Sequence, residues 1–133
     1  MSQENVEIVR RAFETFSRDG PEAALADLSP DVEWHDLPDQ PDAEVHHGHE
    51  GFLAAIEQFF GGFEGYSVNL DEIIDHGEQV VVCVRVIGRG RTSGAGFEQR
   101  PAGGVWTLRD GFVVRVVWFE TRREALKAVG LEE

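Results

Sequence analysis

The first half of the chain spaces its apolar residues as helices do. In the N-terminal segment these residues recur three or four positions apart: Val6, Val9, Phe13 and Phe16. This spacing predicts an amphipathic helix that ends near residue 18. A second, short helix is predicted from Pro21, because proline suits the first helical turn. A third helix is predicted after Gly48, where Phe and Ile residues form one very apolar side.

The rest of the chain predicts strands. Residues 31–37 alternate in polarity, so Trp34 and Asp36 share one face and His35 lies on the other. Longer strands are predicted over residues 66–74, 80–87, 97–108 and 112–120, and a closing helix over 122–129. Pro101 and the glycine pair at 103–104 predict a bulge or sharp bend in the third of these longer strands.

Helices first and a curved sheet last predict a single α+β domain over residues 1–133 that closes into a cone. The strand at 80–87 is apolar on both faces except for Arg85. A strand of that kind is buried on both sides. We therefore expect helices on one face of the sheet and a second subunit on the other, which makes the protein a homodimer.

Composition narrows the classes of partner. The formal net charge is −13, which argues against nucleic acid and anionic membrane surfaces as partners. The first residues lack a secretory signal, and no apolar run approaches the roughly 20 residues that span a bilayer. We therefore expect a cytoplasmic protein. The lone Cys83 lies in an apolar strand and is interpreted as a small hydrophobic core residue.

The order of the elements resembles the nuclear transport factor 2-like superfamily and, within it, the SnoaL-like polyketide cyclase group. The segments that carry the resemblance are residues 5–13, 30–36, 47–52, 106–111 and 123–131. The resemblance implies a cone of three N-terminal helices on a strongly curved mixed or antiparallel sheet, a cystatin-like roll. It covers nearly the whole chain and points to a fold that hosts isomerases, cyclases, hydrolases, dehydratases and non-catalytic binders.

Ketosteroid isomerases resemble this chain in placing a general-base aspartate at the end of the first strand, which matches Asp36. Their oxyanion hole needs a tyrosine on the first helix and a protonated carboxylic acid on the penultimate strand. Those positions fall on Ala12 and Gly104. Neither side chain can donate a hydrogen bond to a developing enolate. The resemblance therefore disfavours a steroid isomerase of that kind.

Limonene-epoxide hydrolases are similar in element order and use an Asp–Arg–Asp trio. Arg85 offers the arginine, but the carboxylate expected midway along the last strand falls on Trp118. SnoaL-type cyclases also use an acidic residue around that position. Trp118 therefore replaces an acid–base group of both mechanisms, and an epoxide hydrolase is disfavoured too.

The residues that remain predict a pocket of their own. Asp36 is the candidate catalytic residue, because a carboxylate held against aromatic rings is suited to abstracting and returning protons. His35 or Glu120 would assist it. The candidate ligand-binding residues are Phe13, Phe16, Trp34, Phe59, Arg85, Trp106 and Trp118. Arg85, if close to Asp36, would instead turn the pair into an anion clamp.

Each candidate also has a structural interpretation. Asp36 could cap the turn that follows it. Glu120 could be exposed or pair with Arg122 or Arg123. Arg85 needs a partner in an apolar strand, and a structural ion pair or a dimer-interface bridge would supply one. The tryptophans could be core residues first and ligand wall second.

Three histidines close in sequence invite a metal interpretation. His46 and His47 are adjacent on an extended segment and so point to opposite sides, and no cysteine or dense carboxylate set accompanies them. We expect no metal site. Instead, one of the pair is predicted to edge the pocket mouth, and His49 or Gly48 to begin the third helix.

The sequence thus predicts a small-molecule pocket in a SnoaL-like enzyme, a cyclase or isomerase. It would use acid–base chemistry on a hydrophobic, ketone-type or polyketide-like substrate, without metal or organic cofactor. The alternative is a non-catalytic module on the same fold that binds a small molecule or assists a partner protein.

Overall fold

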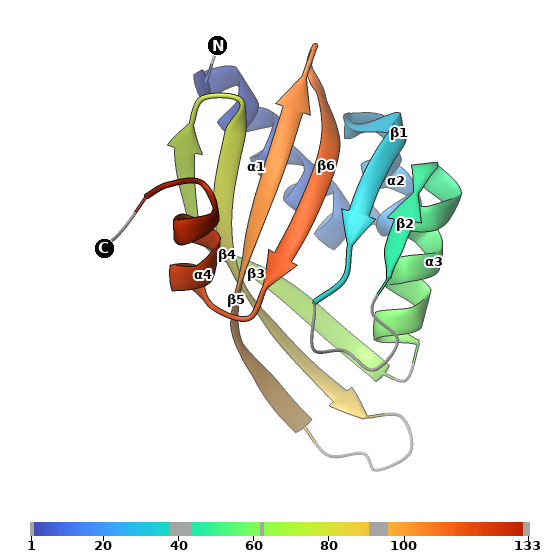
Figure 1. Ribbon diagram of the computed structural model, residues 1–133. Coiled ribbons are helices and arrows are strands. Elements are labelled where there is room, and N and C mark those ends of the chain that lie inside the picture. Colours follow the sequence, from blue (N-terminus) through green and yellow to red (C-terminus); the bar gives the residue numbers. More distant parts are fainter. Residues whose placement is uncertain (1, 38–43, 62, 91–95, 132–133) are drawn as a thin grey trace.

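The computed structural model describes residues 2–37, 44–61, 63–90 and 96–131 (Figure 1). Its helices are α1 (Ser2–Asp19), α2 (Pro21–Ala24), the 3-10 turn η1 (Leu25–Asp27), α3 (Gly48–Phe60) and α4 (Arg122–Ala128). Its strands are β1 (Leu28–His35), β2 (Val45–His47), β3 (Phe63–His76), β4 (Gln79–Gly90), β5 (Gly96–Arg109) and β6 (Phe112–Phe119). None of the helices in these residues is both long enough and apolar enough to cross a membrane.

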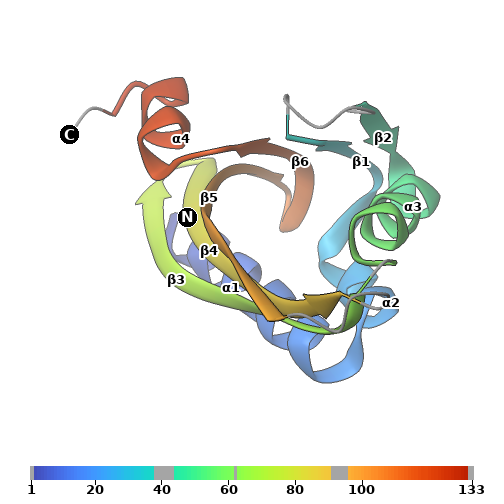
Figure 2. The ribbon, with the colours of Figure 1, turned by 90° about the horizontal axis from the view of Figure 1, so that it is seen from below.

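The strands form one mixed sheet in the order β2-β1-β6-β5-β4-β3. Neighbours are antiparallel except for β1 and β6, which run parallel. Figure 2 shows the sheet curling around an interior that α1, α2 and α3 close on the concave side. The predicted α+β architecture, with N-terminal helices on a strongly curved sheet, is confirmed.

The sequence pattern located most of these elements but not all their ends. The bulge predicted in the third long strand is confirmed, because the β4–β5 register shifts between Val84 and Val86. The β2 strand was not predicted as a separate element. It contains three residues only, too few for a polarity period to be recognised.

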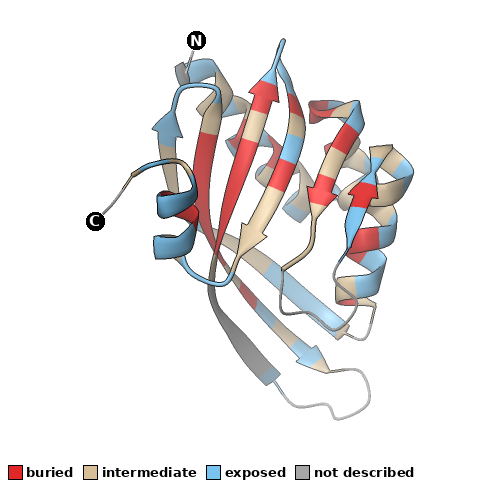
Figure 3. Cartoon of the chain, viewed as in Figure 1, coloured by how far each residue is buried: buried red, intermediate tan, exposed pale blue. Residues whose placement is uncertain are grey.

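The two faces of the sheet are covered by different helices. Alternate residues of β4, from Val80 to Val86, pack in the main core with α1 and α3, whereas Val81 packs in a second cluster with Ala125 and Leu126 of α4. Figure 1 shows α1 and α4 on opposite sides of the sheet, and Figure 3 shows buried residues running along the central strands between them.

A glycine lets α4 approach the sheet closely. A Cβ on Gly103 would lie 2.6 Å from the carbonyl oxygen of Thr121 and 2.7 Å from Cβ of Ala125. Thr121 caps the helix, since its Oγ1 accepts a hydrogen bond from the Glu124 N–H at 3.1 Å. The close packing of α4 against the sheet therefore requires a glycine at position 103.

The position of α4 changes the argument for a second subunit. Val81 is 0% exposed beneath α4 of the same chain. α4 therefore buries this part of the outer face of the sheet, where the apolar strand pattern had suggested a second subunit. The homodimer stays a prediction, based on the apolar strand pattern of the part of the outer face that α4 does not cover.

Cys83 is buried on the same outer face, next to an ion pair between α4 and β3. Arg122 Nε donates to Glu72 Oε1 at 2.6 Å, and this hydrogen bond lowers the pKa of Glu72. Burial, with the nearby Glu72 charge, raises the pKa of the Cys83 thiol to about 11. The sequence interpretation of Cys83 as a buried core residue agrees with its 4% exposure.

The Cys83 thiol is expected to resist modification in the folded protein. With a pKa of about 11, only about one thiol in a thousand is ionised at pH 8, and the thiolate is the reactive form. Ellman's reagent at pH 8 should therefore titrate one thiol per chain rapidly in urea and only slowly in buffer. Equal rates in the two conditions would show that the outer face opens readily.

Candidate functional site

A partly open apolar cavity of about 120 Å³ lies between the helices and the concave face of the sheet. Its wall comes from α1, α2, α3 and the strands other than β2. The predicted ligand-binding residues that line it are Phe13, Phe16, Trp34, Phe59, Trp106 and Trp118. For comparison, an engineered apolar cavity of about 150 Å³ binds benzene. The cavity therefore matches a molecule of about one ring.

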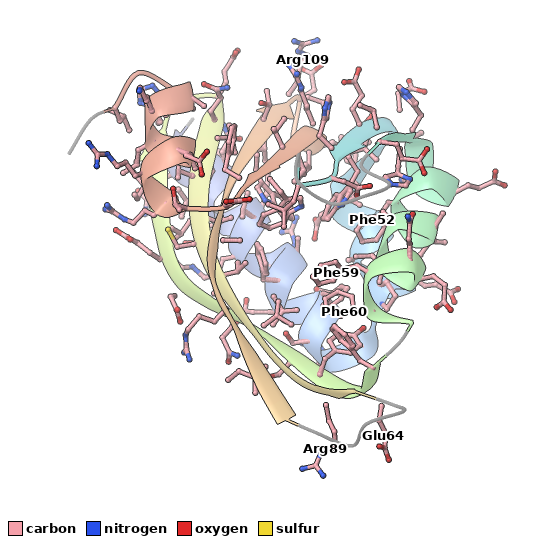
Figure 4. The ribbon with its side chains drawn as sticks, turned by 60° about the horizontal axis from the view of Figure 1, so that its bottom comes forward. Phe52, Phe59, Phe60, Glu64, Arg89 and Arg109 are labelled. Atoms are coloured by element: carbon pink, nitrogen blue, oxygen red, sulfur yellow. The ribbon has the colours of Figure 1, made fainter. Side chains whose placement is uncertain are left out.

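The wall is a set of interlocked aromatic rings centred on Trp34. Its ring lies edge-on to Phe52, with centroids 4.9 Å apart, and to Trp106, 6.0 Å away. Trp118 is 5.8 Å from Trp34, and Trp106 is 5.1 Å from Phe13 on α1. Figure 4 shows the labelled phenylalanines of α3 pointing into the interior, whereas Glu64 and Arg89 point away from it.

Asp36 is the one carboxylate among the residues that line this cavity. It follows the end of β1 and, two residues after Trp34, reaches the same side of the strand. Its backbone N–H donates to the Glu44 carbonyl at 3.2 Å, and the Glu44 N–H donates to Asp36 Oδ2 at 3.3 Å. The side chain is 11% exposed. The end of β1 and two hydrogen bonds with Glu44 therefore hold Asp36 in place.

A buried histidine completes the polar part of the site. His46 Nε2 lies 2.9 Å from Asp36 Oδ2, and the His46 side chain is 7% exposed. In β2, His46 pairs across from Trp34 of β1, which places it on the Asp36 side. Gly51 of α3 packs against it, since a Cβ there would lie 2.9 Å from the His46 carbonyl carbon.

Sequence reasoning predicted that His46 or His47 would edge the pocket, but it left His46 out of the site residues. The signal was present in the alternation: His46 and His47 point to opposite sides, and the hairpin of β1 and β2 places His46 beside Asp36.

His46→Ala is expected to lower the free energy of unfolding by about 1–3 kcal/mol, because Asp36 would keep its burial and lose a hydrogen-bonding partner. His47, the exposed neighbour on the same strand, provides the matched control. His47→Ala should change stability by no more than about 0.5 kcal/mol. Urea denaturation of the two variants measures the difference. Equal losses would show that the Asp36–His46 contact contributes little to stability.

The other predicted site residues lie elsewhere. His35 points to the opposite side of β1, where its Nε2 is 3.1 Å from Glu33 Oε1, and this hydrogen bond lowers the pKa of Glu33. Glu120 follows β6 at an exposed position outside the cavity lining. The structure therefore does not bring His35 or Glu120 to Asp36, and we leave both out of the proposed site.

Arg85 also lies away from the cavity. Its Nε donates to Asp71 Oδ2 at 2.6 Å, and its Nη2 donates to Asp71 Oδ1 at 3.1 Å. On β4 it alternates with the cavity-lining Val84 and Val86, so its side chain leaves the other face of the sheet. Of the interpretations that the sequence allowed, the structure contains the ion pair within the chain, and an anion clamp with Asp36 is not formed.

Ala12 and Gly104 stand at the two positions where ketosteroid isomerases carry their oxyanion donors, and the structure shows what surrounds each of them. Ala12 is buried and lines the cavity. Gly104 lies beneath the indole of Trp118, and a Cβ there would be 2.7 Å from Trp118 Cζ3. The ring of Trp118 thus occupies the space above position 104. An acid side chain there would displace it.

Metal binding finds no support in the described ranges. Among those residues no three His, Cys, Asp or Glu side chains converge on a common point. His49 Nε2 lies 2.9 Å from the Leu28 carbonyl oxygen, so this histidine anchors the start of α3 to β1.

Sequence comparison finds a family for most of the chain. The model of the SnoaL-like domain family matches residues 9–116. No curated protein matches the sequence.

Solved structures share the fold across nearly the full length. An NTF2-like protein of unknown function from Burkholderia pseudomallei is 25% identical, covers 96% of this chain and 98% of its own, and superposes with a TM-score of 0.76. A putative SnoaL-like polyketide cyclase from a Jannaschia species is 23% identical over 89% of this chain and 85% of its own, with a TM-score of 0.75. TerC, co-crystallised with polyporic acid, is 22% identical over 95% and 98%, with a TM-score of 0.76.

Proposed function

We propose that this chain, which belongs to the SnoaL-like domain family, binds a small hydrophobic ketone and transfers a proton on it. The reaction class is an isomerisation or a cyclisation. The observation that carries the proposal is Asp36, the one carboxylate among the cavity-lining residues, hydrogen-bonded to the buried His46. Similarity to a putative polyketide cyclase agrees with this class of reaction.

In the proposed step Asp36 takes a proton from the carbon next to the substrate carbonyl. The C–H bond breaks, its electron pair forms the C=C bond of an enolate, and the carbonyl oxygen gains the negative charge. Return of the proton to another carbon completes an isomerisation. Attack of the enolate carbon on a second carbonyl carbon forms the C–C bond of a cyclisation, and the proton goes to the new alkoxide. A carboxylate can do this without a metal or organic cofactor.

His46 would act as the positioning residue for this base. Both donors to Asp36 from the described residues, the Glu44 N–H and the His46 ring, meet Oδ2. This arrangement leaves Oδ1 to receive the substrate proton. A ligand that fills the cavity would displace water from its apolar wall, which strengthens the electrostatic interactions around Asp36.

Cyclohexanone tests the proposal, because its single ring suits the cavity and its α-protons report on proton abstraction directly. The wild-type protein is incubated with cyclohexanone in D₂O, and loss of the α-proton NMR signal is followed, with protein-free buffer as the control. A thermal shift reports binding separately, since a ligand at about 100 times its dissociation constant stabilises the fold by about 2.7 kcal/mol. Binding with accelerated exchange supports proton transfer, whereas binding without exchange favours the non-catalytic binding module.

A further inference from the structure

One residue of the cavity wall has a buried hydrogen-bond donor with no partner in the part of the chain that the structure describes. Trp106 lines the cavity and is 5% exposed, and its Nε1–H has no hydrogen-bond partner among the described residues. Buried donors are nearly always paired, and each exception costs free energy. An unpaired donor in the wall of a ligand cavity is therefore a place where a ligand can supply the missing acceptor.

Other donors are scarce in this wall. Apart from Asp36, the lining residues have apolar side chains, and three tryptophans, Trp34, Trp106 and Trp118, carry the indole N–H groups. Of these, Trp106 has the donor that is buried and unpaired within the described ranges. Trp106 lies edge-on to the rings of Trp34 and Trp118. A ring face accepts a hydrogen bond more weakly than a carbonyl oxygen does, so a ligand carbonyl would be preferred.

Trp106 and Asp36 line the same cavity. Trp34 and Trp106 both pair with Val116 of β6, so they stand in one row across three strands. Two strand spacings separate their backbones by roughly 10 Å, and the side chains extend into the space between. Asp36 is two residues beyond Trp34 on the same side. Trp106 and Asp36 therefore stand on the same side of the sheet, on strands separated by β6.

We propose that the Trp106 Nε1–H donates a hydrogen bond to the carbonyl oxygen of the ligand and so selects one-ring molecules with an acceptor over apolar molecules of the same shape. This rests on the proposed function, since removal of an α-proton places negative charge on that oxygen. A fixed donor at the developing charge stabilises the transition state. Trp106 would thus be a binding residue and the electrostatic partner of Asp36.

Paired ligands isolate the hydrogen bond. Cyclohexanone and methylenecyclohexane have the same shape, but only the ketone has an oxygen acceptor. Trp106→Phe removes the donor, and Trp118→Phe removes the same atoms from another side of the same cavity. The preference for the ketone, expressed as the ratio of the two dissociation constants, should fall roughly three- to tenfold in Trp106→Phe. In Trp118→Phe it should stay within about twofold of the wild type, because the donor is retained.

NMR of ¹⁵N-labelled protein gives a second readout. The chain has three tryptophans, so the indole signal that disappears in Trp106→Phe identifies Trp106. That signal should move downfield with cyclohexanone and not with methylenecyclohexane. Equal shifts with both ligands, an unchanged ketone preference in Trp106→Phe, or failure of cyclohexanone to bind would overturn the proposal.

The two proposals fail in different ways. A ketone-dependent indole shift without α-proton exchange would keep Trp106 as a binding donor and refute proton transfer. Exchange without that shift would refute the donor role and leave the proton transfer by Asp36 standing.

Discussion

Asp36→Asn is expected to slow the exchange of cyclohexanone α-protons by about 10²- to 10⁴-fold, the usual contribution of a general base. Asparagine has nearly the same size as aspartate and still accepts a hydrogen bond from His46, but its amide cannot take the α-proton. The fold and the cavity should persist, because the other lining residues are unchanged. Exchange is measured by NMR in D₂O for both proteins.

Asp31→Asn is the matched control for this substitution. Asp31 lies on the same strand as Trp34 but is exposed and outside the cavity wall. It should retain the wild-type exchange rate. Thermal shifts with cyclohexanone verify that both variants still bind. If Asp36→Asn exchanges α-protons as fast as wild type does, Asp36 is not the base.

Phe52→Ala is expected to lower the free energy of unfolding by about 3–5 kcal/mol. Phe52 is 3% exposed and packs edge-on against Trp34. Its removal takes apolar contacts from the junction of α3 and β1 and leaves a void beside the existing cavity. Because domains are stable by only about 5–15 kcal/mol, the loss is a large part of the total. Urea unfolding followed by tryptophan fluorescence measures it.

Phe112 provides the same substitution at the surface. It is 44% exposed at the start of β6. Phe112→Ala should therefore cost much less than Phe52→Ala. Similar midpoints for the two variants would mean that α3 is held to the sheet by contacts other than the Phe52–Trp34 pair.

The cavity wall was largely predictable because each residue follows from a local period. Once Trp34 is assigned to the buried face of β1, a two-residue period places Asp36 on the same side. Helical spacing does the same for Phe13 and Phe16 on α1. The orientation of such residues can be predicted without knowing which elements pack against their own helix or strand.

Residues whose role depends on a partner were not predictable in the same way. His46 joins the site because β2 pairs with β1, and a three-residue strand carries no period. Arg85 pairs with Asp71 on the neighbouring strand, and the apolar pattern of β4 alone does not reveal this contact. The cover over Val81 comes from α4, more than forty residues along the chain. Such contacts are set by tertiary packing, not by local pattern.

The parallel pairing of β1 with β6 also governs when, during synthesis, the cavity can form. Trp34 is paired with Val116, about eighty residues later in the chain, and closing so long a loop is entropically costly. Synthesis begins at the N-terminus, so β1 has no partner strand on its β6 side until nearly the whole domain has been made. The wall that carries Asp36 is therefore among the last parts to be secured, and a chain that ends before β6 leaves Trp34 without the strand that holds it in place.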